Sequence, residues 1–155
     1  MSIITKTDAE IDLMREPCAI VRDTLAFVGE RISAGMSTKE VDELVERFIR
    51  AAGAYPSCLG YGGFPASACV SVNEVVVHGI PDDKTILKDG DIVSVDLCAY
   101  KNGFHGDAAR TFLIGNVSEE KRLLVERTKE CFFKGIENLH AGTPLYDIGY
   151  RVQKY

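Results

Sequence analysis

Residues 90–115 read GDIVSVDLCAYKNGFHGDAARTFLIG, and this stretch decides the fold. Two runs rich in strand-forming residues, 92–100 and 104–114, flank the dipeptide Asn102-Gly103. Asn-Gly suits the positive φ angles of a type I′ turn, which joins antiparallel strands through two residues. The sequence therefore predicts a β-hairpin with its turn at this dipeptide.

The register of this hairpin brings two acids together. Counting outward from the turn places Asp96 opposite Ala109 and Asp107 opposite Cys98. The aspartates then share one face as diagonal neighbours, with Cβ atoms up to roughly 7–8 Å apart. Crowded, partly buried carboxylates lose hydration and repel each other, so both stay ionised only if positive charge is supplied. A bound cation would supply it; alternatively, both acids face solvent and protect the sheet from edge pairing.

Three motifs resemble those of the type I methionine aminopeptidases: His78 in VVVHGIP, Asp96 in DIVSVD and Asp107 in GFHGD. The resemblance extends from Ile4 onward and implies that the two aspartates are metal ligands. It also implies that His78 assists catalysis, by donating a hydrogen bond to the substrate or by shuttling a proton. Without the resemblance, a structural role for His78 is the simpler reading. His105 lies two residues before Asp107 and is expected either to orient that carboxylate or to make a structural hydrogen bond.

The resembled family has the pita-bread fold, in which two α/β halves face each other across two divalent metal ions, which are Co, Mn, Fe or Zn. By this resemblance, residues 1–155 form the N-terminal half of the catalytic domain and stop within the second half. The expected fold class is α/β (α+β), with a curved antiparallel sheet covered by helices and the acid-bearing face left open. The second half supplies a histidine and two glutamates as the other ligands. We therefore expect a fragment of a longer enzyme, or a natural half that needs the missing C-terminal half, and a chain that alone is inactive and marginally stable or self-associating.

The glycine-rich, aromatic segment 55–65, YPSCLGYGGFP, has neither helical nor strand periodicity and predicts a loop. The resemblance implies that this region binds the first side chain of the substrate, through Cys58, Tyr61, Phe64, Cys69 and the neighbouring His78. Sulfur atoms and aromatic edges suit the thioether of a methionine. Alternatively, these residues fill the core.

Helices are predicted on both sides of this region. Capping boxes open apolar stripes over residues 7–32 and 37–53, which we expect to cover the sheet. Pro17 lies inside the first stripe and predicts a kink or a break into two pieces, because proline has no N–H to donate. The β-branched runs 68–72 and 75–78 predict strands.

After the hairpin, a third helix is predicted from Ser118 to a point before Gly142. Thr143 and Pro144 then supply a new N-cap and first helical position, so a fourth helix is expected to begin there.

The amino-acid composition argues against several functional classes of protein. With 155 residues, 46% hydrophobic and 26% charged, the chain is long enough for one core of an ordinary soluble protein. A net charge of −5 without basic runs argues against nucleic-acid binding, and no apolar run is long enough to suggest a membrane span. The five cysteines include no C-x-x-C pair, which favours a reducing compartment, and we expect the cytoplasm.

The resemblance implies removal of the N-terminal methionine by two-metal hydrolysis. The expected partners are the N-termini of nascent polypeptides, with the ribosome involved at most indirectly. Two alternatives stay open: a proline-directed relative of the aminopeptidase P or prolidase type, and a non-catalytic binding module with the same fold.

Overall fold

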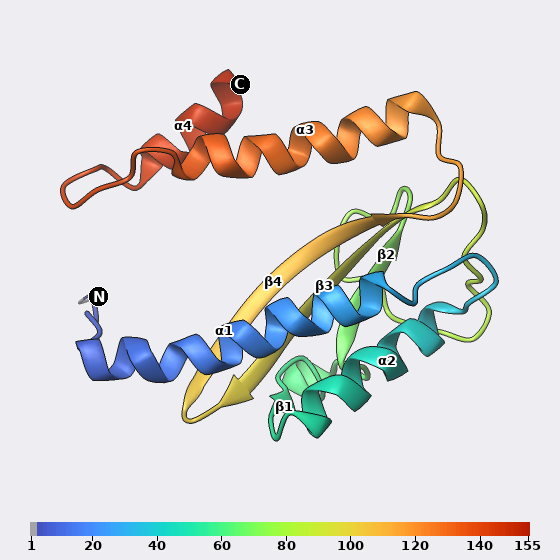
Figure 1. Cartoon of the computed structure of the whole chain (residues 1–155), viewed down its shortest axis with the longest axis horizontal. Coiled ribbons are helices and arrows are strands. Elements are labelled where there is room, and N and C mark those ends of the chain that lie inside the picture. Colours follow the sequence, from blue (N-terminus) through green and yellow to red (C-terminus); the bar gives the residue numbers. More distant parts are fainter. Residues whose placement is uncertain (1–2) are drawn as a thin grey trace. The chain divides into compact units, whose positions relative to one another are not determined.

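The chain forms two units, Met1–Asn116 and Val117–Tyr155, in a computed structural model that describes residues 3–155 (Figure 1). The first unit combines two helices with a four-stranded antiparallel sheet. The second unit consists of two further helices.

The central strand of the sheet is β3, which pairs along its whole length with β4 on one side. On its other side β3 pairs with β1 near one end and with β2 further along. The strands are β1 (Tyr55–Pro56), β2 (Ala68–Val72), β3 (Ile92–Lys101) and β4 (Phe104–Leu113).

The predicted hairpin is confirmed residue by residue. Lys101 pairs with Phe104 at its tip, and the two residues between them, Asn102 and Gly103, have φ angles of 55° and 85°. Both angles lie in the left-handed region that a type I′ turn requires. The local turn chemistry therefore fixes the register of the whole β3–β4 pair.

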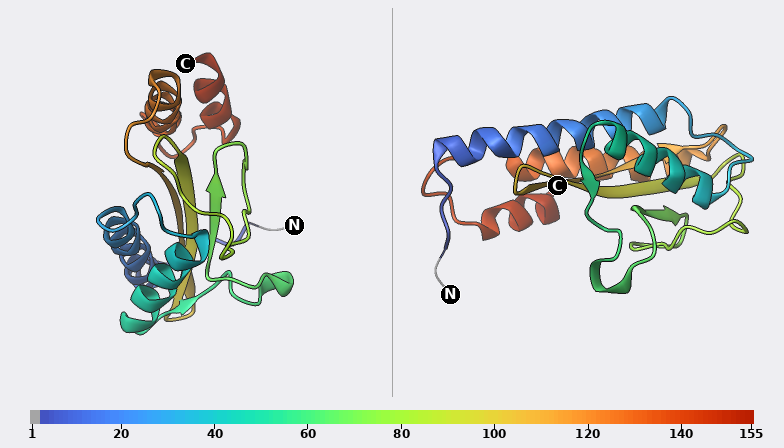
Figure 2. Two further views of the ribbon diagram at one scale, coloured as in Figure 1. Left: turned by 90° about the vertical axis from the view of Figure 1, so that its right-hand side faces the viewer. Right: turned by 90° about the horizontal axis from the view of Figure 1, so that it is seen from below.

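Alternate residues of β3 point to opposite faces of the sheet. One face is buried against α1 (Asp8–Gly29) and α2 (Thr38–Ala51), as Figure 2 shows. The β3 residues of this buried face are Val93, Val95, Leu97 and Ala99. The other face is polar and partly exposed, and it carries Asp96. The prediction that the helices cover one face of the sheet is confirmed.

Both helices of the first unit begin at their predicted capping boxes. The Thr7 hydroxyl accepts from the backbone N–H of Glu10, while the Glu10 carboxylate accepts from the backbone N–H of Thr7. Ser37 and Glu40 form the same reciprocal pair at the start of α2. These pairs satisfy backbone donors that a helix start otherwise leaves free.

Of the two outcomes predicted at Pro17, a kink or a break, the break is wrong, because α1 continues through this residue to Gly29. Pro17 is buried and packs against β4 at Gly106, so closely that a Cβ atom at Gly106 would lie 2.5 Å from the Pro17 carbonyl oxygen. This packing offsets the hydrogen bond that proline cannot make.

The predicted strand 75–78 is also wrong. Asn73 and His78 have positive φ angles of 49° and 58°, so the backbone turns at both ends of the valine run. The three valines are exposed instead of paired. It is Gly79 that lies against β2, where its carbonyl accepts from the N–H of Val70 at 2.9 Å. The predicted strand 68–72 is confirmed as β2.

Segment 55–65 is a loop for most of its length, as predicted, with two short regular pieces. Residues Tyr55–Pro56 pair with β3 as strand β1, and Tyr61–Gly63 form a single 3₁₀ turn. Because β1 pairs with the end of β3, the loop starts beside the hairpin.

The second unit contains α3 (Glu119–Ile136) and α4 (Tyr146–Lys154), which pack against each other. The Ser118 hydroxyl caps α3, as predicted, by accepting from the N–H of Lys121. Helix α4 begins later than predicted, because the Thr143 hydroxyl accepts from the N–H of His140 and does not cap the helix. Within residues 3–155 no helix has the length and apolar character needed to cross a membrane.

Candidate metal centre

Asp96 and Asp107 lie on the partly exposed face of the hairpin, as predicted. Asp96 pairs with Ala109 and Asp107 pairs with Cys98, which makes the two acids diagonal neighbours on adjacent strands. Asp96 is half-buried near the middle of β3, whereas Asp107 is exposed. The pair therefore stands on a rigid two-stranded ribbon whose other face is packed against the helices.

The electrostatic environment of this pair is unfavourable for two negative charges. Burial raises the pKa of the Asp96 carboxyl, the nearby charge of Asp107 raises it further, and His78 acts in the opposite direction. None of the ion pairs formed within residues 3–155 includes either aspartate. A divalent cation between the two carboxylates would supply the positive charge that this part of the chain does not.

The two carboxylates are chemically suitable ligands for a divalent metal ion, but two side chains are too few to complete its coordination. Carboxylate oxygens suit hard and borderline divalent cations, which take four or more ligands. Residues 3–155 contain no group of three or more His, Cys, Asp or Glu side chains arranged to hold a metal ion. Asp96 and Asp107 could supply only part of a metal site, and further ligands would have to come from elsewhere.

His78 is exposed and lies close enough to Asp96 to influence its charge. Its φ angle of 58° is uncommon for a residue other than glycine, although histidine adopts it more readily than most, and such positions cluster at functional sites. The hydrogen bonds between Gly79 and β2 fix the backbone immediately after the histidine. The structure thus brings His78 to the acid pair, while its catalytic role stays a prediction.

Three thiols lie beside the acid pair. The Cys98 thiol lies near both Cys58 and Asp107, and its interactions with these groups raise its pKa. Hydrogen bonding to Cys98 lowers the pKa of the Cys58 thiol to about 7, whereas burial raises that of Cys69 to about 11. Cys69 pairs with Asp96 across β2 and β3. Sequence reasoning did not include Cys98 in the site, although the predicted register already placed it opposite Asp107.

The residues expected to bind the substrate side chain differ in exposure. Cys58 and Phe64 are half-buried and Cys69 is buried, but the Tyr61 side chain is 83% exposed. Cys58 and Cys69 both lie near the acid pair. Tyr61 lies on the 3₁₀ turn and is exposed, so the alternative that these residues fill the hydrophobic core is wrong for Tyr61.

His105 contacts the loop that follows β1 and the neighbouring strand β3. Its Nδ1 atom is 2.9 Å from the Ser57 hydroxyl, and its ring packs against Tyr100 with 4.8 Å between centroids. His105 shares the face of Asp107, as alternation along β4 requires. The structural hydrogen bond predicted as one alternative for His105 is present, with Ser57 as its partner. The other alternative, that His105 orients the Asp107 carboxylate, stays a prediction.

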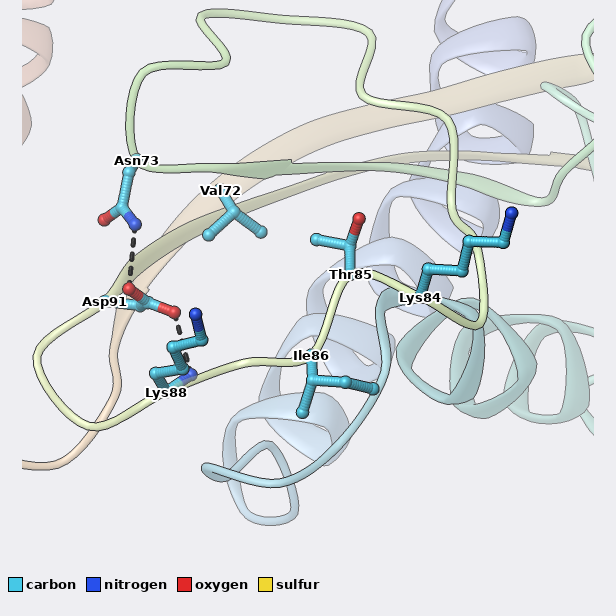
Figure 3. A pocket seen from close by; sticks show the side chains of 7 residues that line it. All are labelled: Val72, Asn73, Lys84, Thr85, Ile86, Lys88 and Asp91. Carbon is cyan, nitrogen blue, oxygen red and sulfur yellow. Dashed lines mark hydrogen bonds between the residues drawn. The ribbon is translucent and has the colours of Figure 1, made fainter.

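A cavity of about 350 Å³ lies away from these residues, between the end of β2 and segment 84–88 (Figure 3). Asn73 and the backbone N–H of Lys88 both donate to the Asp91 carboxylate at its wall, each at 2.8 Å. These hydrogen bonds hold Asp91, the residue just before β3, in place. The cavity therefore belongs to the scaffold of the hairpin and not to the acid pair.

Residues 12–155 match metallopeptidase family M24. The chain belongs to this family. A methionine aminopeptidase of Clostridium acetobutylicum is 50% identical over 153 residues, which are 99% of this chain and 61% of that protein. The resemblance found in the sequence motifs is thereby confirmed, and membership of family M24 agrees with the use of divalent metal ions.

Solved structures of two peptidases share the fold of this chain. The crystal structure of methionine aminopeptidase from Rickettsia prowazekii superposes with a TM-score of 0.96 at 37% identity, covering 99% of this chain and 62% of that one. Prolidase from Pyrococcus furiosus gives a TM-score of 0.83 at 24% identity, covering 97% and 43%. The predicted fold class is confirmed, and the prolidase likeness shows the fold alone. The chain spans about three fifths of the length of the methionine aminopeptidases that it matches.

Proposed function

We propose that this M24 chain is part of an enzyme that removes methionine from the N-termini of polypeptides, with Asp96 and Asp107 as two of its metal ligands. The observation that carries the proposal is the convergence of the two carboxylates on one face of a rigid hairpin, where neither forms an ion pair with a side chain of residues 3–155. The relatives named methionine aminopeptidase support it.

Each part of the site has a proposed role. Asp96 and Asp107 would hold divalent cations, with Co, Mn, Fe and Zn as candidates. When bound, divalent ions lower the pKa of a water molecule and polarise a peptide carbonyl. His78 donates a hydrogen bond to the substrate beside Asp96. The methionine side chain is received by the surrounding residues Cys58, Tyr61, Phe64 and Cys69.

Metal ligands beyond the acid pair, a histidine and two glutamates by resemblance, are proposed to come from a longer form of the protein. The 155-residue chain alone is then inactive and binds divalent cations weakly, because most of the ligands are missing. We further propose that the protein acts in the cytoplasm on the N-termini of nascent chains, without direct contact with nucleic acid or membrane.

The test compares the 155-residue chain with the product of its full reading frame. Both are assayed with Mn²⁺ or Co²⁺ for release of methionine from a Met-Ala-Ser peptide, and with an Xaa-Pro peptide as the competing substrate. The longer form should release methionine, and Asp107→Asn should reduce that activity by at least about a hundredfold, the size of effect seen when metal sites are disturbed. Asp83→Asn, which changes an exposed acid outside the pair, is the matched control.

Three results would contradict this proposal. Full activity of Asp107→Asn would remove the acid pair from the site. Hydrolysis of the Xaa-Pro peptide alone would favour the proline-directed class. Metal binding without hydrolysis of either peptide would favour a binding module.

A further inference from the structure

Strand β4 is the outermost strand on its side of the sheet (Figure 1). In an antiparallel hairpin with a two-residue turn, the two residues that flank the turn exchange hydrogen bonds, and every second pair along the ladder does the same. The even-numbered residues within 104–112 therefore bond to β3. Beyond the strand, the N–H of Ile114 donates to the Asp91 carbonyl, which continues the same alternation.

The odd-numbered residues of β4 consequently direct their N–H and carbonyl groups away from β3. These residues are His105, Asp107, Ala109, Thr111 and Leu113. No hydrogen bond formed within residues 3–155 uses a backbone group of any of them. Residues 107–110 are all exposed, whereas β3 alternates between buried and half-buried residues as far as Ala99. The outer edge of β4 is therefore an open row of backbone donors and acceptors.

Strand β4 lacks most of the features that protect an edge strand from pairing with another chain. It is ten residues long, contains neither proline nor lysine, and pairs with β3 without a bulge. The other side of the sheet is better protected, because β1 has only two residues and the N–H of Val70 in β2 donates to the Gly79 carbonyl. Among the described residues, β4 is thus the one long open edge of the sheet.

We propose that this edge is an interaction surface whose partner is the β4 edge of a second copy of the chain. The two strands pair antiparallel about a two-fold axis at Ala109, which joins the sheets of both copies and sets their acid-bearing faces on the same side. The outward-facing residues then exchange about ten backbone hydrogen bonds, two for each facing pair. A two-fold contact uses the same surface of both copies, so pairing through this edge ends with two copies.

The charges on β4 favour this register. With the axis at Ala109, Asp107 lies opposite Thr111 of the other copy, and Arg110 lies opposite Ala108 of the other copy. The two Asp107 carboxylates are then roughly 13 Å apart along the strands, beyond the Debye length of about 8 Å at physiological ionic strength. An axis at Asp107 would instead place these carboxylates directly opposite each other, where like charges destabilise a cross-strand pair.

The experiment measures amide exchange of the 155-residue chain, residue by residue, at low and high protein concentration, together with sedimentation. We expect the N–H groups of Asp107, Ala109 and Thr111 to exchange at least about tenfold more slowly as the weight-average mass rises. Those of Ala108 and Arg110, which already bond to β3, should change little. Mass alone does not identify the contact, because the second unit also has exposed apolar side chains.

Thr111→Glu and Thr111→Lys form a matched pair of variants. Both remove the hydrogen bond between the Thr111 and Ser94 hydroxyls, so they differ in the charge that faces Asp107 of the other copy. Glutamate should weaken association about threefold and lysine should strengthen it about threefold, as expected for cross-strand charge pairs. High salt should reduce this difference. Circular dichroism checks that both variants are folded.

Three results would overturn the proposal. The chain stays monomeric at every concentration, its mass rises without slower exchange at Asp107, Ala109 and Thr111, or both variants change association in the same direction. None of these measurements uses peptide hydrolysis, so they are independent of whether the longer protein releases methionine.

Discussion

At the scale of single residues, Asp42 connects α2 to the start of β2. Its side chain is 1% exposed, and its Oδ1 atom accepts from the backbone N–H groups of Ser67 and Ala68 at 2.8 and 2.9 Å. Asp42→Ala leaves both buried donors without an acceptor, and we expect it to lower the free energy of unfolding by roughly 2–5 kcal/mol. Urea denaturation followed by circular dichroism measures this loss.

Lys39→Ala is the matched control for Asp42. The ammonium group of Lys39 is 3.2 Å from the Asp42 carboxylate, and the lysine side chain is 36% exposed. The lysine is partly exposed and its removal leaves both backbone hydrogen bonds to Asp42 in place, so this variant should lose less than about 1 kcal/mol. Equal losses in the two variants would mean that the ion pair, and not the pair of backbone hydrogen bonds, holds α2 against the sheet.

Asp82 makes the stability of the first unit depend on pH. Its carboxylate accepts from the backbone N–H groups of Thr85 and Lys84 and from the Thr85 hydroxyl, and these bonds lower its pKa. A lowered pKa in the folded state stabilises the fold above the ordinary aspartate pKa, and the effect is lost as pH falls through the folded value. We expect Asp82→Asn to destabilise the chain at neutral pH and to match the wild type in acid.

The measurement for Asp82 is the urea midpoint across this pH range. Asp83→Asn removes the same charge from the neighbouring position and controls for net charge. A constant difference between Asp82→Asn and the wild type at all pH values would show that the carboxylate charge is not what stabilises the turn.

At the scale of elements, the contact between α1 and β4 depends on Gly106. A Cβ atom at this position would lie 2.5 Å from the carbonyl carbon and oxygen of Pro17 and 2.6 Å from the nitrogen of Cys18. All three atoms are backbone, so the helix would have to move. We expect Gly106→Ala to cost roughly 1–3 kcal/mol, measured by urea denaturation.

The control for Gly106 is the same substitution where space is available. A Cβ atom at Gly149 in α4 meets no heavy atom within 4 Å, so Gly149→Ala should raise helix stability by roughly 0.5–1 kcal/mol. If Gly106→Ala proved equally harmless, the close contact with Pro17 would not be a constraint on the fold.

The hairpin and the valine run 75–78 show which parts of the secondary structure the local sequence determines. The hairpin was predictable in full, because Asn102-Gly103 sets the turn and alternation then sets every pair. The valine run 75–78 has the composition of a strand, yet two left-handed residues and the contact of Gly79 with β2 prevent pairing. Whether a β-branched run pairs depends on a partner elsewhere in the chain, which composition does not reveal.

The same distinction applies to the candidate site. Asp96 and Asp107 could be placed on one face from the sequence, since both belong to one hairpin. The nearness of Cys98 to Cys58 was not predicted, because β1 and the loop that follows bring Cys58 to this part of β3. Contacts between distant segments require the tertiary structure, even where each segment is predicted correctly.

At the scale of the whole molecule, apolar side chains remain exposed on the helices of the second unit. Phe132 is 60% exposed on α3, and Tyr146 on α4 is 77% exposed. Several further residues of this unit are similarly exposed: Leu123, Leu124, Phe133, Ile136, Leu139, Leu145 and Tyr150. Exposed apolar groups of this number usually mark a surface that associates with another one.

We therefore expect the 155-residue chain to self-associate, with a weight-average mass in sedimentation that rises with concentration. Phe132→Lys should weaken association by about tenfold, because burial of a phenylalanine side chain contributes roughly 1.5–3 kcal/mol. Gln153→Lys adds the same charge at an exposed position of α4 and should leave association unchanged. A wild-type chain that stays monomeric at every concentration would show that these side chains are covered within one molecule, and equal effects of both lysines would assign the change to charge instead of apolar contact.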